Sequence, residues 1–153
     1  MQAQIEQIEQ QHEENGIVYR HLSTRTVNRG VSNASYFSNY DTFCKMLLNK
    51  GYGVQKDIKN KKYIILDVNG KKLLIYFSTH TKSNTNYLVN DELDSRIGQF
   101  VFFNPFTKKP NYVSASLVKE FIAQCKERVT FNNKEWYIRI PEKWVNKNRK
   151  TIS

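Results

Sequence analysis

The chain has 153 residues, of which 39% are hydrophobic and 13% aromatic, and its formal net charge is +10. A chain of this length is typical of one domain that buries roughly 70% of its unfolded surface, so the composition excludes global disorder. No apolar run reaches the ~18–20 residues of a membrane span, and the Gln- and Glu-rich start has no signal-peptide character. We therefore expect a cytoplasmic protein with no membrane partner.

The first segment, residues 1–15, is acidic and Gln/Glu-rich. Residues 1–19 carry four glutamates and neither Lys nor Arg, so removing their −4 from the net +10 leaves +14 on residues 20–153. Ile5 and Ile8 form a narrow apolar stripe at helical spacing. We predict an acidic N-terminal helix or arm over 1–15, followed by one basic domain over 16–153.

The next region combines a strand, a loop and a helix. Residues 17–23 alternate between apolar and polar side chains and predict a strand. Residues 24–39 are polar and rich in Ser, Asn and Arg, which predicts a long loop. Ser38 or Asn39 can cap a helix that stops at Gly51.

The clearest local signal is a hairpin. Two apolar runs, 63–68 and 71–77, flank the dipeptide Asn69-Gly70. Asn-Gly between apolar runs is the strongest short-range hairpin signal, because both residues accept the positive φ of a two-residue turn. The prediction places Val68 opposite Lys71.

The C-terminal half adds further elements. A strand over 99–104 is stopped by Pro105, a helix over 115–127 starts at Ser114 or Ser116, and a strand over 136–140 ends at Pro141, with a basic exposed tail behind it. The order predicts an α+β fold. We expect an antiparallel, hairpin-based sheet of about four to five strands flanked by two helices, plus the N-terminal helix.

From residue 41 onward, the predicted order α-β-β-β-α-β resembles the core of the PD-(D/E)xK nucleases. The resemblance implies two acids that hold a divalent metal and a Lys two residues after the second acid. Continuing the hairpin register places Asp57 opposite Lys82 and Lys59 opposite His80. Asp57, His80 and Lys82 would then be the catalytic residues, with His80 in the place of a carboxylate. This alternative function is a metal-dependent nuclease that uses Mg²⁺.

Nucleic-acid binding has broader support. A basic domain attracts polyanions, and basic residues interleaved with aromatic ones suit a surface that holds phosphates and stacks on bases. We predict that the partner is DNA or RNA, bound without a cofactor or metal. The predicted contact residues are Arg20, Arg25, Arg29, Lys59, Lys61, Lys62, Lys71, Lys72, Lys108, Lys109, Trp144, Lys147, Arg149 and Lys150.

A further alternative is a protein-binding inhibitor of a nucleic-acid-handling host enzyme, such as a phage anti-defence protein. Heavy use of Lys, Asn, Ile and Tyr suits the AT-rich genes of phages and mobile elements. The acidic segment would meet a basic groove of the target, or the basic domain an acidic one.

The remaining reactive residue types have structural explanations. The acids between Asp91 and Asp94 lack the spacing of a metal-binding loop, so we expect them to cap a turn or to pair with Arg96. Cys44 and Cys125 are expected as free thiols on two different helices.

Overall fold

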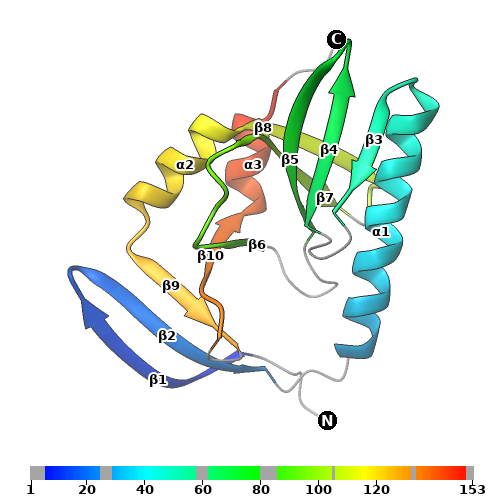
Figure 1. Ribbon diagram of the computed structural model, residues 1–153. Helices are drawn as coiled ribbons and strands as arrows, with labels where there is room; N and C mark the ends of the chain where they lie inside the picture. Colours follow the sequence, from blue (N-terminus) through cyan, green and yellow to red (C-terminus); the bar gives the residue numbers. More distant parts are fainter. Residues whose placement is uncertain are drawn as a thin grey trace.

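The computed structural model describes residues 6–24, 29–57, 62–79, 86–104, 106–131 and 134–150; in residues 6–9, 23–24 and 29–37 it describes the backbone alone. These ranges hold three helices and ten strands in two five-stranded sheets. The predicted α+β class is confirmed. Figure 1 shows the long helix α1 on one side of the molecule and the two shorter helices, α2 and α3, toward the other.

Sheet A has the strand order β1-β2-β9-β10-β6. The parallel pair β2 and β9 joins the N-terminal hairpin to the C-terminal strands, and all other pairs are antiparallel. Its strands are β1 (Glu6–Glu14), β2 (Ile17–Thr24), β9 (Glu127–Thr130), β10 (Tyr137–Pro141) and β6 (Asn86–Asn90).

The predicted N-terminal helix is wrong, because the described part of that segment is strand β1, which pairs along its length with β2. Asn15 and Gly16 connect the strands with positive φ angles of 54° and 81°. This is the two-residue turn whose twist matches that of paired strands. Pairing with β2 decides the structure, because the segment has too narrow an apolar face to stabilise a helix.

Sheet B has the strand order β3-β4-β5-β7-β8. The predicted hairpin register is confirmed, since Val68 pairs with Lys71 and the ladder continues to Tyr63 opposite Tyr76. The parallel pairing of β5 with β7 makes the sheet mixed. Its strands are β3 (Gly53–Lys56), β4 (Tyr63–Val68), β5 (Lys71–Thr79), β7 (Ile97–Asn104) and β8 (Lys109–Ser114).

The three helices differ in how well the sequence predicts them. Helix α1 (Arg29–Asn49) begins about ten residues before the predicted cap, so the predicted loop over 24–39 is wrong from residue 29 onward. Helix α2 (Ala115–Gln124) starts after Ser114, as expected. Helix α3 (Glu142–Asn148) occupies the tail predicted to be only exposed and basic. None of the helices in the described ranges is long and apolar enough to cross a membrane.

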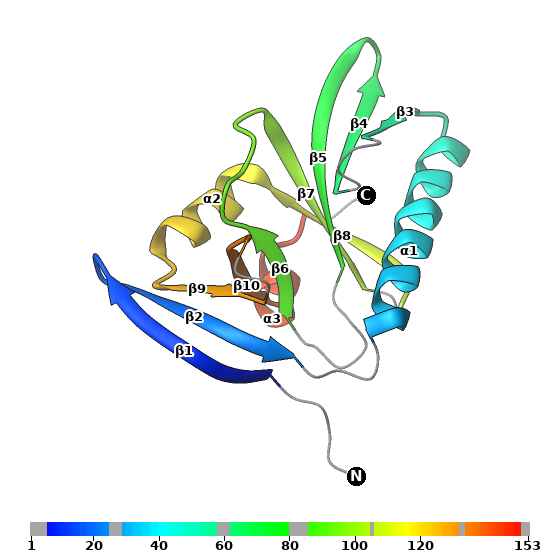
Figure 2. The same ribbon diagram turned by 60° about the horizontal axis from the view of Figure 1, so that its bottom comes forward.

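Sheet B separates two apolar clusters. On one face, α1 packs Phe43 and Leu47 against residues that include Phe77 and Phe103. On the other face, Tyr76 and its neighbours pack with strands β6 and β10 and with α2 and α3. Figure 2 shows α1 on its own side of sheet B, with sheet A, α2 and α3 on the other. Helix α3 is thereby fixed beside the edge strand β8.

Candidate nucleic-acid interface

Six exposed cations lie on helix α3 and strand β8 or directly beside them in the chain. We call this set the basic strip: Lys108, Lys109, Lys143, Lys147, Arg149 and Lys150. Five of the six are among the predicted contact residues; Lys143 is the addition. Arg149 Nη1 donates to Asn111 Oδ1 on β8 at 3.0 Å, and the Lys150 amide donates to the Tyr112 carbonyl at 2.7 Å. The chain after α3 is therefore held along the open edge of sheet B.

The other end of the strip is the turn between β7 and β8. Asn104 and Lys109 pair directly, so their side chains lie on the same face of sheet B. Asn104 Nδ2 donates to Glu142 Oε2 at the start of α3, at 2.5 Å. Lys108 and Lys109 are thus anchored next to the first turn of the helix that carries Lys143 and Lys147.

The strip is electrostatically unbalanced. None of its six cations forms an ion pair with a carboxylate of the described residues, and all six side chains are exposed. Lys143 and Lys147 are four residues apart on α3, where two like charges destabilise a helix by about 0.2–0.5 kcal/mol. A bound polyanion would relieve this repulsion.

Glu142 is the acid closest in sequence to the strip, and its carboxylate faces inward. Its Oε2 accepts hydrogen bonds from Asn104 Nδ2 and from the Tyr87 hydroxyl, the latter at 3.4 Å. Burial and the nearby Glu142 carboxylate raise the pKa of Tyr87 above its ordinary value. The carboxylate therefore anchors α3 to the body while the lysines point outward.

Trp144 takes part in helix packing. It is half-buried, and its ring lies 5.0 Å from that of Phe121 on α2. Val145, the next residue, is fully buried in the same apolar cluster. This face of α3 holds the helix in place, so the opposite face is the one that presents lysines.

Three other predicted cations, Lys62, Lys71 and Lys72, lie on strands other than β8 or next to them. Lys71 and Lys72 lie at the turn between β4 and β5, where Lys72 Nζ is 3.8 Å from Asp67 Oδ2. Lys62 is turned inward: it donates to Asn90 Oδ1 at 2.8 Å and lies over the Tyr137 ring. Burial lowers the pKa of Lys62. Arg25, Lys59 and Lys61 lie outside the described residues, and the Arg29 side chain is not described.

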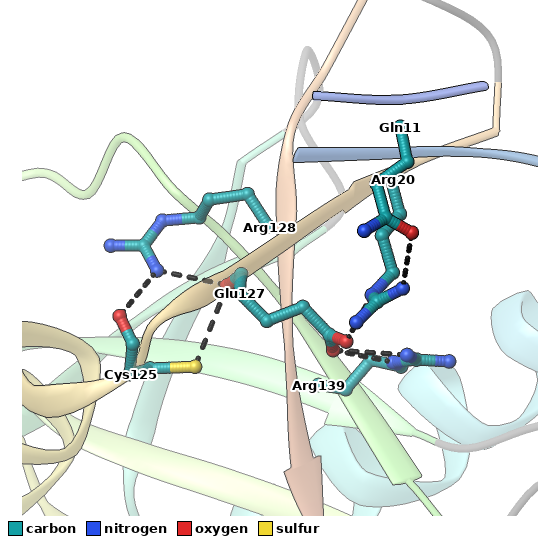
Figure 3. Close-up of polar contacts among 6 residues, drawn as sticks. All are labelled: Gln11, Arg20, Cys125, Glu127, Arg128 and Arg139. Atoms are coloured by element: carbon teal, nitrogen blue, oxygen red, sulfur yellow. Dashed lines mark hydrogen bonds and ion pairs between the residues drawn. The ribbon is translucent and has the colours of Figure 1, made fainter. Parts of the chain in front are cut away.

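Arg20 belongs to an ion-pair network on sheet A (Figure 3). Glu127 on β9 accepts a hydrogen bond from Arg20 Nε at 2.7 Å and from Arg139 Nη2 at 2.9 Å. Arg20 also donates to Gln11 Oε1 on β1 at 2.8 Å. The network links the four strands β1, β2, β9 and β10. It also engages Arg20, a cation predicted to contact phosphates, in contacts within the protein.

The Glu127 network predicts an acid-dependent stability. Desolvation raises the pKa of Glu127, but hydrogen bonds and charges from Arg139 and Arg20 outweigh it and lower the pKa below 4.5. A lowered folded-state pKa stabilises the protein above the unfolded-state value, and this stabilisation disappears as pH falls through the folded value. We expect Glu127→Gln to lower stability at pH 7 and to flatten its decline below about pH 4.5. Urea titrations from pH 3 to 7 measure this, and parallel curves for both proteins would contradict it.

A group of aromatic rings lies on the opposite face of the N-terminal hairpin. His12 and Tyr19, a directly paired couple, stack with ring centroids 5.0 Å apart. Trp136 packs its ring edge-on against Tyr19 and His21, at 5.0 and 5.1 Å. These rings contact one another, so the cluster joins β1 and β2 to the start of β10.

Of the predicted nuclease residues, Asp57 is the one that lies in the described ranges. Asp57 follows β3, and its amide donates to the Tyr63 carbonyl at 3.2 Å, on the side of β4 away from β5. Residues 53–57 and 63–68 are thus separate antiparallel segments, and β4 does not extend back to Asp57 as the predicted register assumed. His80 and Lys82 lie outside the described residues. In the described ranges, no group of three or more His, Cys, Asp or Glu could hold a metal ion.

The structural explanations of the other reactive residues are confirmed for Asp94 and for the two free thiols, whereas Asp91 pairs with Arg128 and Cys125 lies just outside its predicted helix. Arg96 pairs with Asp94 at 2.7 Å, and this pair lowers the pKa of Asp94 to about 2. Cys44 is a free, buried thiol on α1, and Cys125 is a free, half-buried thiol directly after α2.

Comparisons with known proteins give little support for a specific activity. No family profile matches the chain, and no similar curated protein was found. Among solved structures, the chain is similar to the bacterial homing endonuclease I-Ssp6803I, with 15% identity and a TM-score of 0.39. The match covers 71% of this chain and 86% of that one. A likeness this weak supports no conclusion about function, which has to be argued from the site.

Proposed function

We propose that this protein binds nucleic acid through the basic strip, with its lysines and Arg149 contacting backbone phosphates. The observation that carries the proposal is that six cations on or next to β8 and α3 are exposed and form no ion pair with a carboxylate of the described residues. Neutralising phosphates releases condensed counterions, which is the main source of sequence-independent affinity for nucleic acid.

The length of helix α3 suits contact with a short stretch of nucleic-acid backbone. Helix α3 has seven residues and is about 10 Å long, which matches the rise of about three nucleotides along one DNA strand. Val145 and Glu142 anchor α3 to the body of the protein. The backbone that carries the cations of α3 therefore needs little ordering on binding.

The test is the salt dependence of binding. We expect the full chain to bind a labelled single-stranded 20-mer. If all six cations contact phosphates, the logarithm of the association constant should fall against the logarithm of the salt concentration with a slope of about −4. Fluorescence anisotropy between 50 and 200 mM salt measures the slope. Absence of binding at 50 mM salt, or affinity independent of salt, would contradict the proposal and leave a protein partner as the stronger alternative.

A further inference from the structure

The turn between β7 and β8 presents an exposed aromatic ring next to the basic strip. Phe106 is 62% exposed, the largest exposed fraction among the large hydrophobic side chains of the described residues. It precedes Thr107 and the two strip residues Lys108 and Lys109. An exposed Phe followed closely by lysines is the pairing of ring and charge that single-strand binding surfaces use.

The backbone of this turn is held rigidly. Asn104 Oδ1 accepts hydrogen bonds from the amides of Phe106 and Thr107, at 2.8 and 3.3 Å. The Lys108 amide donates to the Asn104 carbonyl at 2.9 Å, and Lys108 has a positive φ of 58°. Because Asn104 Nδ2 also donates to Glu142, the turn and α3 are fixed to each other. The ring is therefore presented at a defined place relative to the cations.

We propose that Phe106 stacks on an unpaired base, so that the ligand of the basic strip is single-stranded nucleic acid. This inference rests on the proposed function. Every base has a π-face, so stacking on a Phe ring adds affinity without sequence preference, while the neighbouring lysines hold the phosphates. In an intact duplex the base faces are stacked on each other, and the ring has no such partner.

The setting of Phe106 favours a base over an apolar protein surface. The residues that follow it in the turn are polar or cationic, whereas the other exposed large hydrophobics, Leu48, Tyr52 and Leu117, are on or near α1 and α2. A protein-docking core is rich in apolar residues and poor in lysine. The ring here is followed within three residues by two of the cations that a phosphate backbone requires.

The experiment compares Phe106→Ala with Leu48→Ala, a matched removal of an exposed apolar side chain from α1. Both proteins are titrated with a 20-nucleotide oligo-dT and with a duplex of the same length, and salt slopes are recorded. We expect Phe106→Ala to weaken single-strand binding by about 5- to 150-fold, the range of one base–aromatic stack. Its salt slope and duplex affinity should equal those of the wild type, Leu48→Ala should match the wild type throughout, and Phe106→Trp should retain single-strand affinity.

The outcomes separate the two proposals. If Phe106→Ala binds the single strand as tightly as Leu48→Ala does while the salt slope persists, the stacking role is wrong and the basic strip stands. If Phe106→Ala weakens duplex and single strand equally, the preference for an unpaired base is wrong. If the wild type binds neither ligand at 50 mM salt, the proposed function itself fails, and the inference fails with it.

Discussion

Replacing four strip lysines should abolish most of the nucleic-acid affinity. In the variant K108Q/K109Q/K143Q/K147Q, we expect the dissociation constant for a single-stranded 20-mer at 50 mM salt to rise by at least about 100-fold. The salt slope should flatten by about 3, since each phosphate contact to a single strand contributes about 0.7. These four side chains are exposed and form no ion pair with described carboxylates, so the fold should persist.

A control variant with the same net charge tests whether the affinity depends on where the lysines lie or only on the net charge of the protein. The variant K45Q/K50Q/K119Q/K126Q removes the same four charges from α1 and α2 and from the residues just after these helices, outside the basic strip. We expect it to keep most of the affinity and the slope, because screening at 50 mM salt limits the contribution of distant charges. Equal losses in both variants would mean that only the net charge of the protein matters, and would contradict a localised interface.

The two hairpins show what the sequence can reveal. Asn69-Gly70 lies between two apolar runs, and its predicted register agrees with the structure pair for pair. Asn15-Gly16 is the same dipeptide with the same positive φ angles, but the strand before it is dominated by Gln and Glu. Read as a turn signal, it would have predicted the N-terminal hairpin. The polar composition of β1 concealed a strand that depends on its partner β2.

Helix α1 shows the opposite limit. Its first half is rich in Ser and Asn, which disfavour helix interiors, so local propensity predicts a loop. The second half is anchored by Tyr40, Phe43 and Leu47 in the apolar cluster on the face of sheet B that α1 covers. Helix formation is cooperative, so an anchored second half lets the helix extend through residues of poor propensity.

The basic strip could be predicted only in part. Composition identifies Lys108, Lys109 and the C-terminal cations as candidates, but 35 residues separate Lys108 from Lys143, and only tertiary packing joins them. The contacts responsible, Asn104 with Glu142 and Asn111 with Arg149, are between polar side chains that carry no periodic signal. The sequence does carry a cue for Phe106, because this aromatic residue stands in a Pro-bounded loop shortly before Lys108 and Lys109.

The largest stability effect should come from a cation that faces inward. Arg128 on β9 is 9% exposed in its side chain, pairs with Asp91 at 3.1 Å, and donates to the carbonyls of Cys125 and Glu127 at 3.1 and 2.9 Å. Removing a buried member of such a network leaves the partner carboxylate and the carbonyl groups unsatisfied. We expect Arg128→Gln to lower the free energy of unfolding by about 3–5 kcal/mol, measured by urea denaturation at pH 7.

Arg96→Gln is the matched control, because Arg96 also pairs with an aspartate but is 80% exposed in its side chain. An exposed pair contributes little to stability because solvent screens it, so this variant should unfold close to the wild-type midpoint. Equal losses for the two arginines would contradict the anchoring role of Arg128. Should Arg128→Gln not fold, Arg128→Lys, which keeps the charge but loses the planar fork, should fold with reduced stability. Because Arg128 makes its contacts inside the molecule, the folded Arg128→Lys protein should bind nucleic acid with an unchanged salt slope.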